Sequence, residues 1–101
     1  MLNVGGLAAA PGVPLALTRT VSGSTVTLNW LPPADGGAPT SYIIEAGTGR
    51  GLTNIARFDT GSAVPMVTVN AVPPGAYWVR VRARNAQGLG SPTVDIRLVV
   101  P

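Results

Sequence analysis

The chain has 101 residues, of which 46% are hydrophobic, 11% charged and 5% aromatic, and its formal net charge is +3. This length is near the commonest size of a single domain and allows one hydrophobic core without staples. Cysteine and histidine are absent, which excludes disulfides and thiolate metal sites. Every basic residue is an arginine, and the arginines form no dense run. We therefore expect no nucleic-acid partner.

The sequence contains no segment that is suited to a membrane. No run approaches the roughly 18 continuous apolar residues that a membrane helix needs, so we expect no membrane insertion. The first ten residues are apolar and rich in Gly and Ala, and no positive charge precedes Arg19, unlike in a secretory signal. We interpret residues 1–10 as a linker or an appended tail and residues 11–101 as the domain.

Short runs of alternating polar and apolar residues, rich in β-branched and aromatic side chains, follow one another and are separated by Gly and Pro. The expected strands lie at Leu15–Thr20, Thr25–Trp30, Ser41–Ala46, Ile55–Thr60, Val67–Val69 and Tyr77–Arg84, and in a last segment with Val94, Ile96 and Leu98 inward. Each strand has one apolar face, which a second layer must cover. The sequence therefore predicts an all-β, immunoglobulin-like two-sheet sandwich of about seven antiparallel strands, with a small barrel as the alternative.

Three stretches of the sequence resemble one protein family. The residues from Val26 to Tyr42, VTLNWLPPADGGAPTSY, resemble the B strand, B–C loop and C strand of fibronectin type III domains. Val72–Asn85 resembles the E–F turn and F strand of that family, with Val72 where Leu is usual, and Gly88–Pro92 resembles its F–G loop. The resemblance implies that Trp30 is central in the core. It also implies that the Tyr77 hydroxyl bonds to backbone just upstream.

The side chains that most catalytic sites need are missing. Without His, Cys or Lys, the usual bases for a nucleophilic Ser or Thr are absent. The acids Asp35, Glu45, Asp59 and Asp95 are isolated in sequence, so no metal site is predicted. The glycines from Gly47 to Gly51 are followed by neither a Lys nor a helix pattern, unlike those of a phosphate loop. We expect no enzymatic activity and no cofactor.

The most distinctive feature is the face of Tyr77–Arg84 that alternation turns away from the core. The row on this face consists of Trp78, Arg80, Arg82 and Arg84, with Arg97 beside them if the last strand pairs as in the family. One interpretation is a binding face, because Trp offers a stacking platform and Arg grips carboxylates or sulfates. The other, which we prefer, is a solvated face whose arginines cover apolar surface and pair with Glu45 and Asp95.

Two hypotheses for function follow. The preferred one is a non-catalytic spacer or accessory module of a larger extracellular or cell-surface protein, next to other domains of the same chain. The resemblance implies this, because bacterial type III domains often stand beside catalytic or adhesive modules. Abundant Ala, Gly, Pro, Val and Arg without Lys favour a GC-rich bacterial source. The alternative is an adhesion or recognition module for a protein or polysaccharide, using the outward row or the loops at residues 32–40 and 85–92. Under either hypothesis we expect a monomer.

Overall fold

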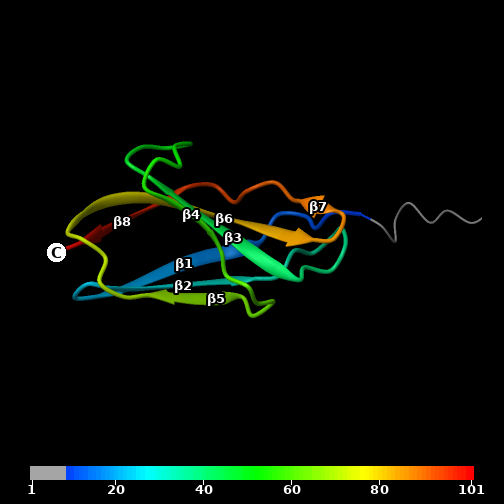
Figure 1. The fold of residues 1–101 in the computed structure, drawn as a ribbon, viewed down its shortest axis with the longest axis horizontal. Coiled ribbons are helices and arrows are strands. Elements are labelled where there is room, and N and C mark those ends of the chain that lie inside the picture. The colour runs from blue at the N-terminus through cyan, green and yellow to red at the C-terminus, as the bar shows by residue number, and fades with distance from the viewer. Residues whose placement is uncertain (1–8) are drawn as a thin grey trace, which may run out of the picture.

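A computed structural model describes residues 9–101 of the chain as a two-sheet β-sandwich (Figure 1). The strands are β1 (Leu15–Ser22), β2 (Thr25–Leu31), β3 (Ser41–Gly47), β4 (Ala56–Asp59), β5 (Met66–Val69), β6 (Gly75–Asn85), β7 (Gly88–Leu89) and β8 (Ile96–Val100). One sheet has the order β1-β2-β5; the other has the order β4-β3-β6, with β7 and β8 both paired to β6. All neighbours are antiparallel. The predicted all-β sandwich is confirmed.

The core lies between the two sheets and comes from the faces that alternation predicts. Its buried members are Val26, Leu28, Trp30, Tyr42, Ile44, Val79, Val81, Ala83, Leu98 and Val100. Trp30 is only 3% exposed, and its ring meets that of Tyr42 edge to face with centroids 5.0 Å apart. Such an aromatic pair stabilises beyond the area that it buries. The predicted central place of Trp30 is confirmed.

The predicted inward position of Val94 is wrong. Val94 is 83% exposed, and β8 begins only at Ile96. Thr93 lies opposite Val81, whose carbonyl accepts the Thr93 N–H at 3.0 Å and whose N–H donates to the Thr93 hydroxyl at 3.1 Å. Ile96 lies opposite Val79. The two residues between Thr93 and Ile96 therefore lie opposite a single residue of β6. This segment thus has one residue more than the strand beside it, as in a β-bulge, and the bulge turns the Val94 side chain to the solvent.

Two further local features concern the ends of β6. The loop predicted at Asn85–Pro92 contains the two-residue strand β7, which pairs with the end of β6. At the start of β6, the Tyr77 hydroxyl donates to the Pro73 carbonyl at 2.5 Å, as the resemblance implies. This bond closes the turn in which Gly75 takes a φ of 151°, a conformation that favours glycine. No helix able to cross a membrane occurs within residues 9–101.

The described chain enters the sandwich at one end and leaves it at the other (Figure 1). At the first end Pro11 bridges to Gly36, and the Ala9 carbonyl accepts a hydrogen bond from the Asn85 side chain at 2.9 Å. At the opposite end Val100 pairs with Gly75. The boundary expected between residues 10 and 11 stays a prediction, since most of the expected tail lies outside the described residues.

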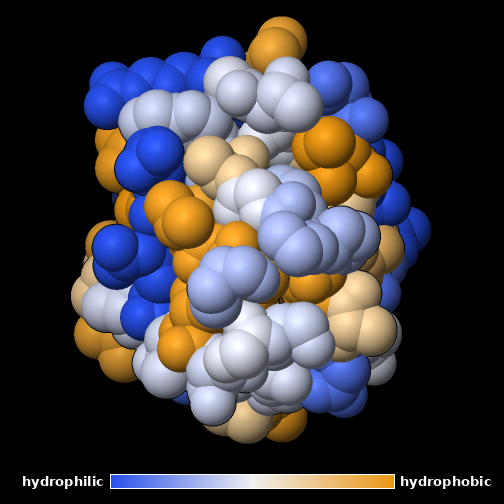
Figure 2. Space-filling view, turned by 90° about the vertical axis from the view of Figure 1, so that its left-hand side faces the viewer, coloured by the Kyte–Doolittle hydropathy of each residue, from blue (hydrophilic) through white to orange (hydrophobic). Residues whose placement is uncertain are grey.

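A small apolar cavity of about 100 Å³ lies between the sheets near the end where the chain leaves. Its lining includes core side chains and the less buried Ile55, Val72 and Tyr77. Figure 2 views this end and shows apolar surface reaching the outside between polar side chains. The apolar areas are interrupted, so this end carries no broad continuous apolar face.

Candidate functional site

The outward face of the five-stranded sheet carries the row expected from the sequence. Val79, Val81 and Ala83 of β6 are buried, which confirms the alternation along this strand. Glu45 of β3 lies opposite Arg80 of β6 on one side and opposite Arg57 of β4 on the other. Residues directly opposite each other in a sheet present their side chains on the same face. The face is therefore shared by three strands.

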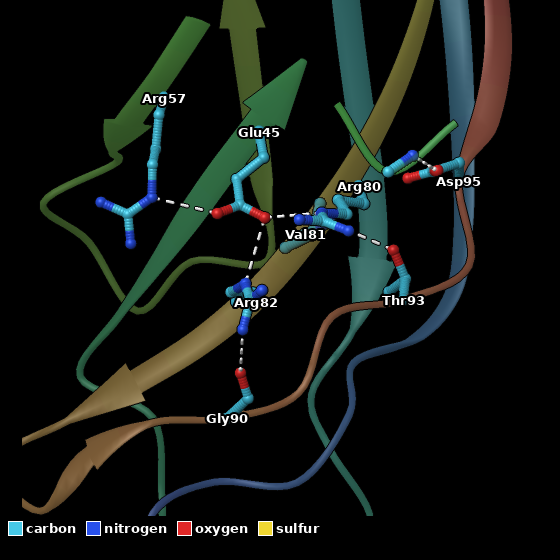
Figure 3. Close-up of polar contacts among 9 residues, drawn as sticks. Glu45, Arg57, Arg80, Val81, Arg82, Gly90, Thr93 and Asp95 are labelled. Atoms are coloured by element: carbon cyan, nitrogen blue, oxygen red, sulfur yellow. Dashed lines mark hydrogen bonds and ion pairs between the residues drawn. The ribbon is translucent and has the colours of Figure 1, made fainter. Parts of the chain in front are cut away.

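One buried carboxylate, that of Glu45, holds three arginines (Figure 3). Its Oε1 accepts the Nε–H of Arg80 at 2.6 Å and that of Arg82 at 3.1 Å, and its Oε2 accepts the Nε–H of Arg57 at 3.0 Å. Glu45 is only 4% exposed, and a buried charge is costly unless it is paired and hydrogen-bonded. Burial raises the pKa of Glu45, but the hydrogen bonds from the three arginines outweigh it, so the pKa lies below that of an ordinary glutamate.

A second ion pair lies on the same face. Arg84 donates through Nη1 to Asp59 Oδ2 at 2.8 Å. The Asp59 carboxylate also accepts the Ser41 hydroxyl at 3.2 Å and the Gly61 N–H at 2.8 Å. The Gly61 N–H is the largest influence and lowers the pKa of Asp59; burial opposes it, and Arg84 and Ser41 lower it further.

The two remaining members of the predicted row lie at the other end of β6. Trp78 is opposite Arg97 of β8. The guanidinium carbon of Arg50 lies 4.7 Å from the centre of a Trp78 ring, which is a cation–π contact. Arg97 makes no ion pair with any acid in the described part of the chain. The structure therefore divides the row, with Trp78 and Arg97 outside the two ion-paired groups.

The prediction of a solvated face is partly wrong. The expected pairing of arginines with Glu45 is confirmed. The face is not fully solvated, however, because Glu45 and Ile43 are buried, with Ile43 only 6% exposed. The expected pairing with Asp95 is absent from the ion pairs of residues 9–101. Asp95 Oδ2 instead accepts the N–H of Gly51 at 2.6 Å (Figure 3). Asp95 belongs to the bulged segment before β8, which alters its direction relative to the predicted register.

Sequence reasoning missed Arg57 as a member of this face. Arg57 lies in a run that was predicted as a strand, and its alternation with Ala56 and Phe58 places it on one face of that strand. Which strand lies beside β4 depends on pairing between distant segments, which a single sequence does not show. The other predicted recognition region, the loops at 32–40 and 85–92, does come together: the Asn85 side chain donates to the Ala38 carbonyl at 3.3 Å.

The described residues contain no group of three or more acidic, His or Cys side chains that could hold a metal ion. Each acid on or near the face is already engaged. Glu45 accepts bonds from three arginines, Asp59 from Arg84, and Asp95 from the backbone of Gly51. The chemistry that this face offers is thus cationic hydrogen-bond donation from arginine.

The fibronectin type III domain model matches residues 9–98 of the chain. The chain belongs to the fibronectin type III family. It is 37% identical over 94 residues to the titin homolog of Caenorhabditis elegans. The alignment covers 91% of this chain and a share of that protein that rounds to 0%. It is 41% identical over 80 residues to Roundabout homolog 1 of Homo sapiens, covering 72% of this chain and 4% of that protein. The chain thus spans only a small fraction of the length of these relatives.

A solved structure agrees with this assignment. The FN5 domain of Drosophila Lar superposes with a TM-score of 0.70 at 25% identity, covering 90% of this chain and 97% of that chain. Fibronectin type III domains thus occur as modules of larger multidomain proteins, as the two long relatives illustrate. These named relatives are animal proteins, so they lend no support to the bacterial source that the composition favours, which stays a prediction.

Proposed function

We propose that this fibronectin type III domain is a non-catalytic linking module within a larger multidomain chain. The observation that carries the proposal is the placement of the two ends of the described chain at opposite ends of the sandwich (Figure 1). The entering segment lies against Gly36, and the leaving strand pairs with Gly75. Domains that precede and follow would therefore be set apart along one line rather than side by side.

Two features of the structure suit a linking role. The core is closed by the domain's own side chains, with Trp30 and Tyr42 at 3% and 1% exposure, so folding needs no neighbouring domain. The lack of catalysis is supported by the composition, which offers no His, Lys or Cys, and by the engagement of Glu45 and Asp59 in ion pairs.

Small-angle scattering of two copies joined head to tail tests the linking role. With ends at opposite poles, the tandem should have a maximum dimension close to twice that of one copy, and its distance distribution should show two separated maxima. A single copy measured under the same conditions is the control. A tandem that is as compact as two domains packed side by side would contradict the proposal.

A second candidate function is recognition of a protein or polysaccharide by the outward row of Trp78, Arg80, Arg82, Arg84 and Arg97. The crowding of three arginines around one carboxylate favours it, because that arrangement leaves surplus positive charge on the surface. A polysaccharide pull-down with wild type and a Trp78→Ala, Arg82→Ala double variant tests it. Binding that is lost in a folded variant would support recognition, and equal binding by both proteins would speak against this face.

An extracellular or cell-surface setting, a bacterial source and a monomeric state complete the proposal. The setting is supported by the family resemblance, and the source by a composition with seven arginines and no lysine. Analytical ultracentrifugation tests the monomeric state. The parent gene tests the setting, through the domains encoded beside this one, and the source, through the genome that carries it. Neighbouring catalytic or adhesive domains in an exported protein are the expected finding, and a cytoplasmic parent would contradict it.

A further inference from the structure

The arginine cluster around Glu45 carries more positive charge than this carboxylate needs. Three guanidinium groups surround one carboxylate, so the cluster has a charge of 3 − 1 = +2. A single arginine can satisfy a carboxylate with two parallel hydrogen bonds. The other two add mutual repulsion, which water and salt screen in part and a further negative charge would relieve more fully. The cluster thus carries net positive charge that an anion can neutralise.

The same guanidinium groups keep donors for such a charge. Arg57, Arg80 and Arg82 all use Nε toward Glu45, and Arg82 also donates through Nη1 to the Gly90 carbonyl at 3.3 Å. Among residues 9–101, the terminal nitrogens of Arg57 and Arg80 make no hydrogen bond. Arg57 is 53% exposed, so its terminal nitrogens are open to a ligand. Because Glu45 already orders these side chains, a ligand loses less affinity to ordering them.

A hollow of about 410 Å³ adjoins the cluster. It is lined by Ile43, Arg57, Phe58, Asp59, Arg84 and Leu89. Arg57 belongs both to this hollow and to the Glu45 cluster, so the two are continuous. Ile43 is almost fully buried, whereas Leu89 is 38% exposed and offers apolar surface to a ligand. The site therefore combines cationic donors with the part-exposed apolar side chains of Phe58 and Leu89, in a hollow that the Asp59–Arg84 ion pair also lines.

We propose that this face, formed by Arg57, Arg80, Arg82, Phe58 and Leu89, binds an acidic peptide segment of a partner protein. Carboxylates of the segment pair with the terminal nitrogens of the arginines, since the guanidinium fork matches a carboxylate bidentately. An apolar side chain of the segment enters the hollow. The inference rests on the recognition role of this face and is independent of the linking role.

The competing anion, a sulfated polysaccharide, fits the face less well. It supplies negative charge but no apolar side chain for the hollow. A sugar ring would also use an aromatic platform, and Arg50 covers one side of Trp78 at 4.7 Å from the ring centre. Charge and shape together thus favour the peptide.

The test uses fluorescence anisotropy with a labelled peptide in which Glu and Leu alternate. Three matched probes accompany it: the peptide with Gln for each Glu, the peptide with Ser for each Leu, and a sulfated oligosaccharide of equal charge. The protein variants are Arg57→Gln and Leu89→Ser in the site. Arg19→Gln, on β1 of the other sheet, is the control with the same charge change. Denaturation midpoints of all variants establish that they are folded.

The Glu/Leu peptide should bind wild type, and Arg57→Gln should weaken binding by about three- to fivefold, the upper part of the range for one exposed ion pair. Arg19→Gln should change the affinity by less than about twofold, since an exposed distant charge is screened. Leu89→Ser should abolish the preference for the Leu peptide over the Ser peptide. This second variant decides the matter if Arg57→Gln fails to fold.

Several results would overturn the inference. They are no binding of the Glu/Leu peptide, equal binding of the Gln peptide, equal losses in Arg57→Gln and Arg19→Gln, or binding of the sulfated oligosaccharide alone. The last of these would leave recognition by this face standing with a different ligand. None of them bears on the linking role, which small-angle scattering of the tandem tests separately.

Discussion

Replacing Glu45 by Gln removes the negative charge on which three arginines converge while keeping the size of the side chain. The wild-type carboxylate is 4% exposed and accepts hydrogen bonds of 2.6, 3.0 and 3.1 Å. In the variant the amide oxygen can still accept a bond, but its NH₂ group faces guanidinium donors that it cannot satisfy. The three arginines then carry uncompensated charge on a partly buried surface.

The size of the loss follows from the exposure of each arginine. Arg57 is 53% exposed and regains water when the carboxylate is gone, so its bond contributes little. Arg80 and Arg82 are 18% and 24% exposed and are less easily rehydrated. Two charge-assisted bonds at about 1.5–3 kcal/mol each, less one such bond that the Gln amide oxygen can still accept from an arginine, give a loss of about 1.5–3 kcal/mol in the free energy of unfolding. This is a large share of the roughly 5–15 kcal/mol typical of a domain.

The effect of Glu45→Gln should depend on pH. Because the pKa of Glu45 is lowered in the folded state, its contribution to stability is complete above the pKa of the unfolded state. The contribution is lost as the pH falls through the lower, folded pKa. The difference between wild type and Glu45→Gln should therefore be largest at neutral pH and shrink in acid.

Urea denaturation followed by tryptophan fluorescence, at neutral pH and in acid, measures this difference. Asp95→Asn is the matched control, since Asp95 accepts a hydrogen bond from the Gly51 backbone and has no arginine partner within residues 9–101. It should cost less than Glu45→Gln at neutral pH. Equal midpoints for wild type and Glu45→Gln at neutral pH, or a difference that persists unchanged in acid, would refute the reasoning.

Three further substitutions test the fold. Trp30→Ala should reduce the free energy of unfolding by about 3–5 kcal/mol, because the side chain is 3% exposed; an unchanged denaturation midpoint would exclude its core role. Tyr77→Phe should cost about 0.5–1.5 kcal/mol in the same assay through loss of the bond to Pro73, and no loss would mean that this bond is not stabilising. Thr93→Val should cost about 1–3 kcal/mol and speed exchange of the Val81 amide, which loses its acceptor; unaltered exchange would argue against the pairing.

Much of the sandwich could be predicted because local alternation carries it. In β6 the buried Val79, Val81 and Ala83 alternate with arginines, and a half-buried strand requires this pattern. Trp30 could be placed in the core for the same reason. Val94 was misplaced because a bulge changes which residue faces inward without breaking the pattern of the sequence. The Thr93 hydroxyl accepts the Val81 N–H in place of a backbone carbonyl. Nothing in a single sequence predicts this substitution of a side-chain acceptor for a backbone one.

The candidate site was predictable only in part. The arginines of β6 are visible as a row in the sequence, but their organisation depends on the strands beside them. Glu45 is buried because β3 lies between β4 and β6 and arginines from both sides cover it. This arrangement joins residues that are far apart in the chain. Alternation alone therefore predicted a solvated face, where the structure has a buried carboxylate beneath arginine side chains.

The most direct test of the Glu45 cluster is NMR of the arginine Nε–H groups, compared between wild type and Glu45→Gln. In wild type the Nε protons of Arg57, Arg80 and Arg82 should exchange with water more slowly than that of Arg19, because each donates to the Glu45 carboxylate. Glu45→Gln should shift these three signals and speed their exchange together, while Arg19 stays unchanged. If all arginine Nε protons exchange alike in wild type, a single buried carboxylate does not organise this face.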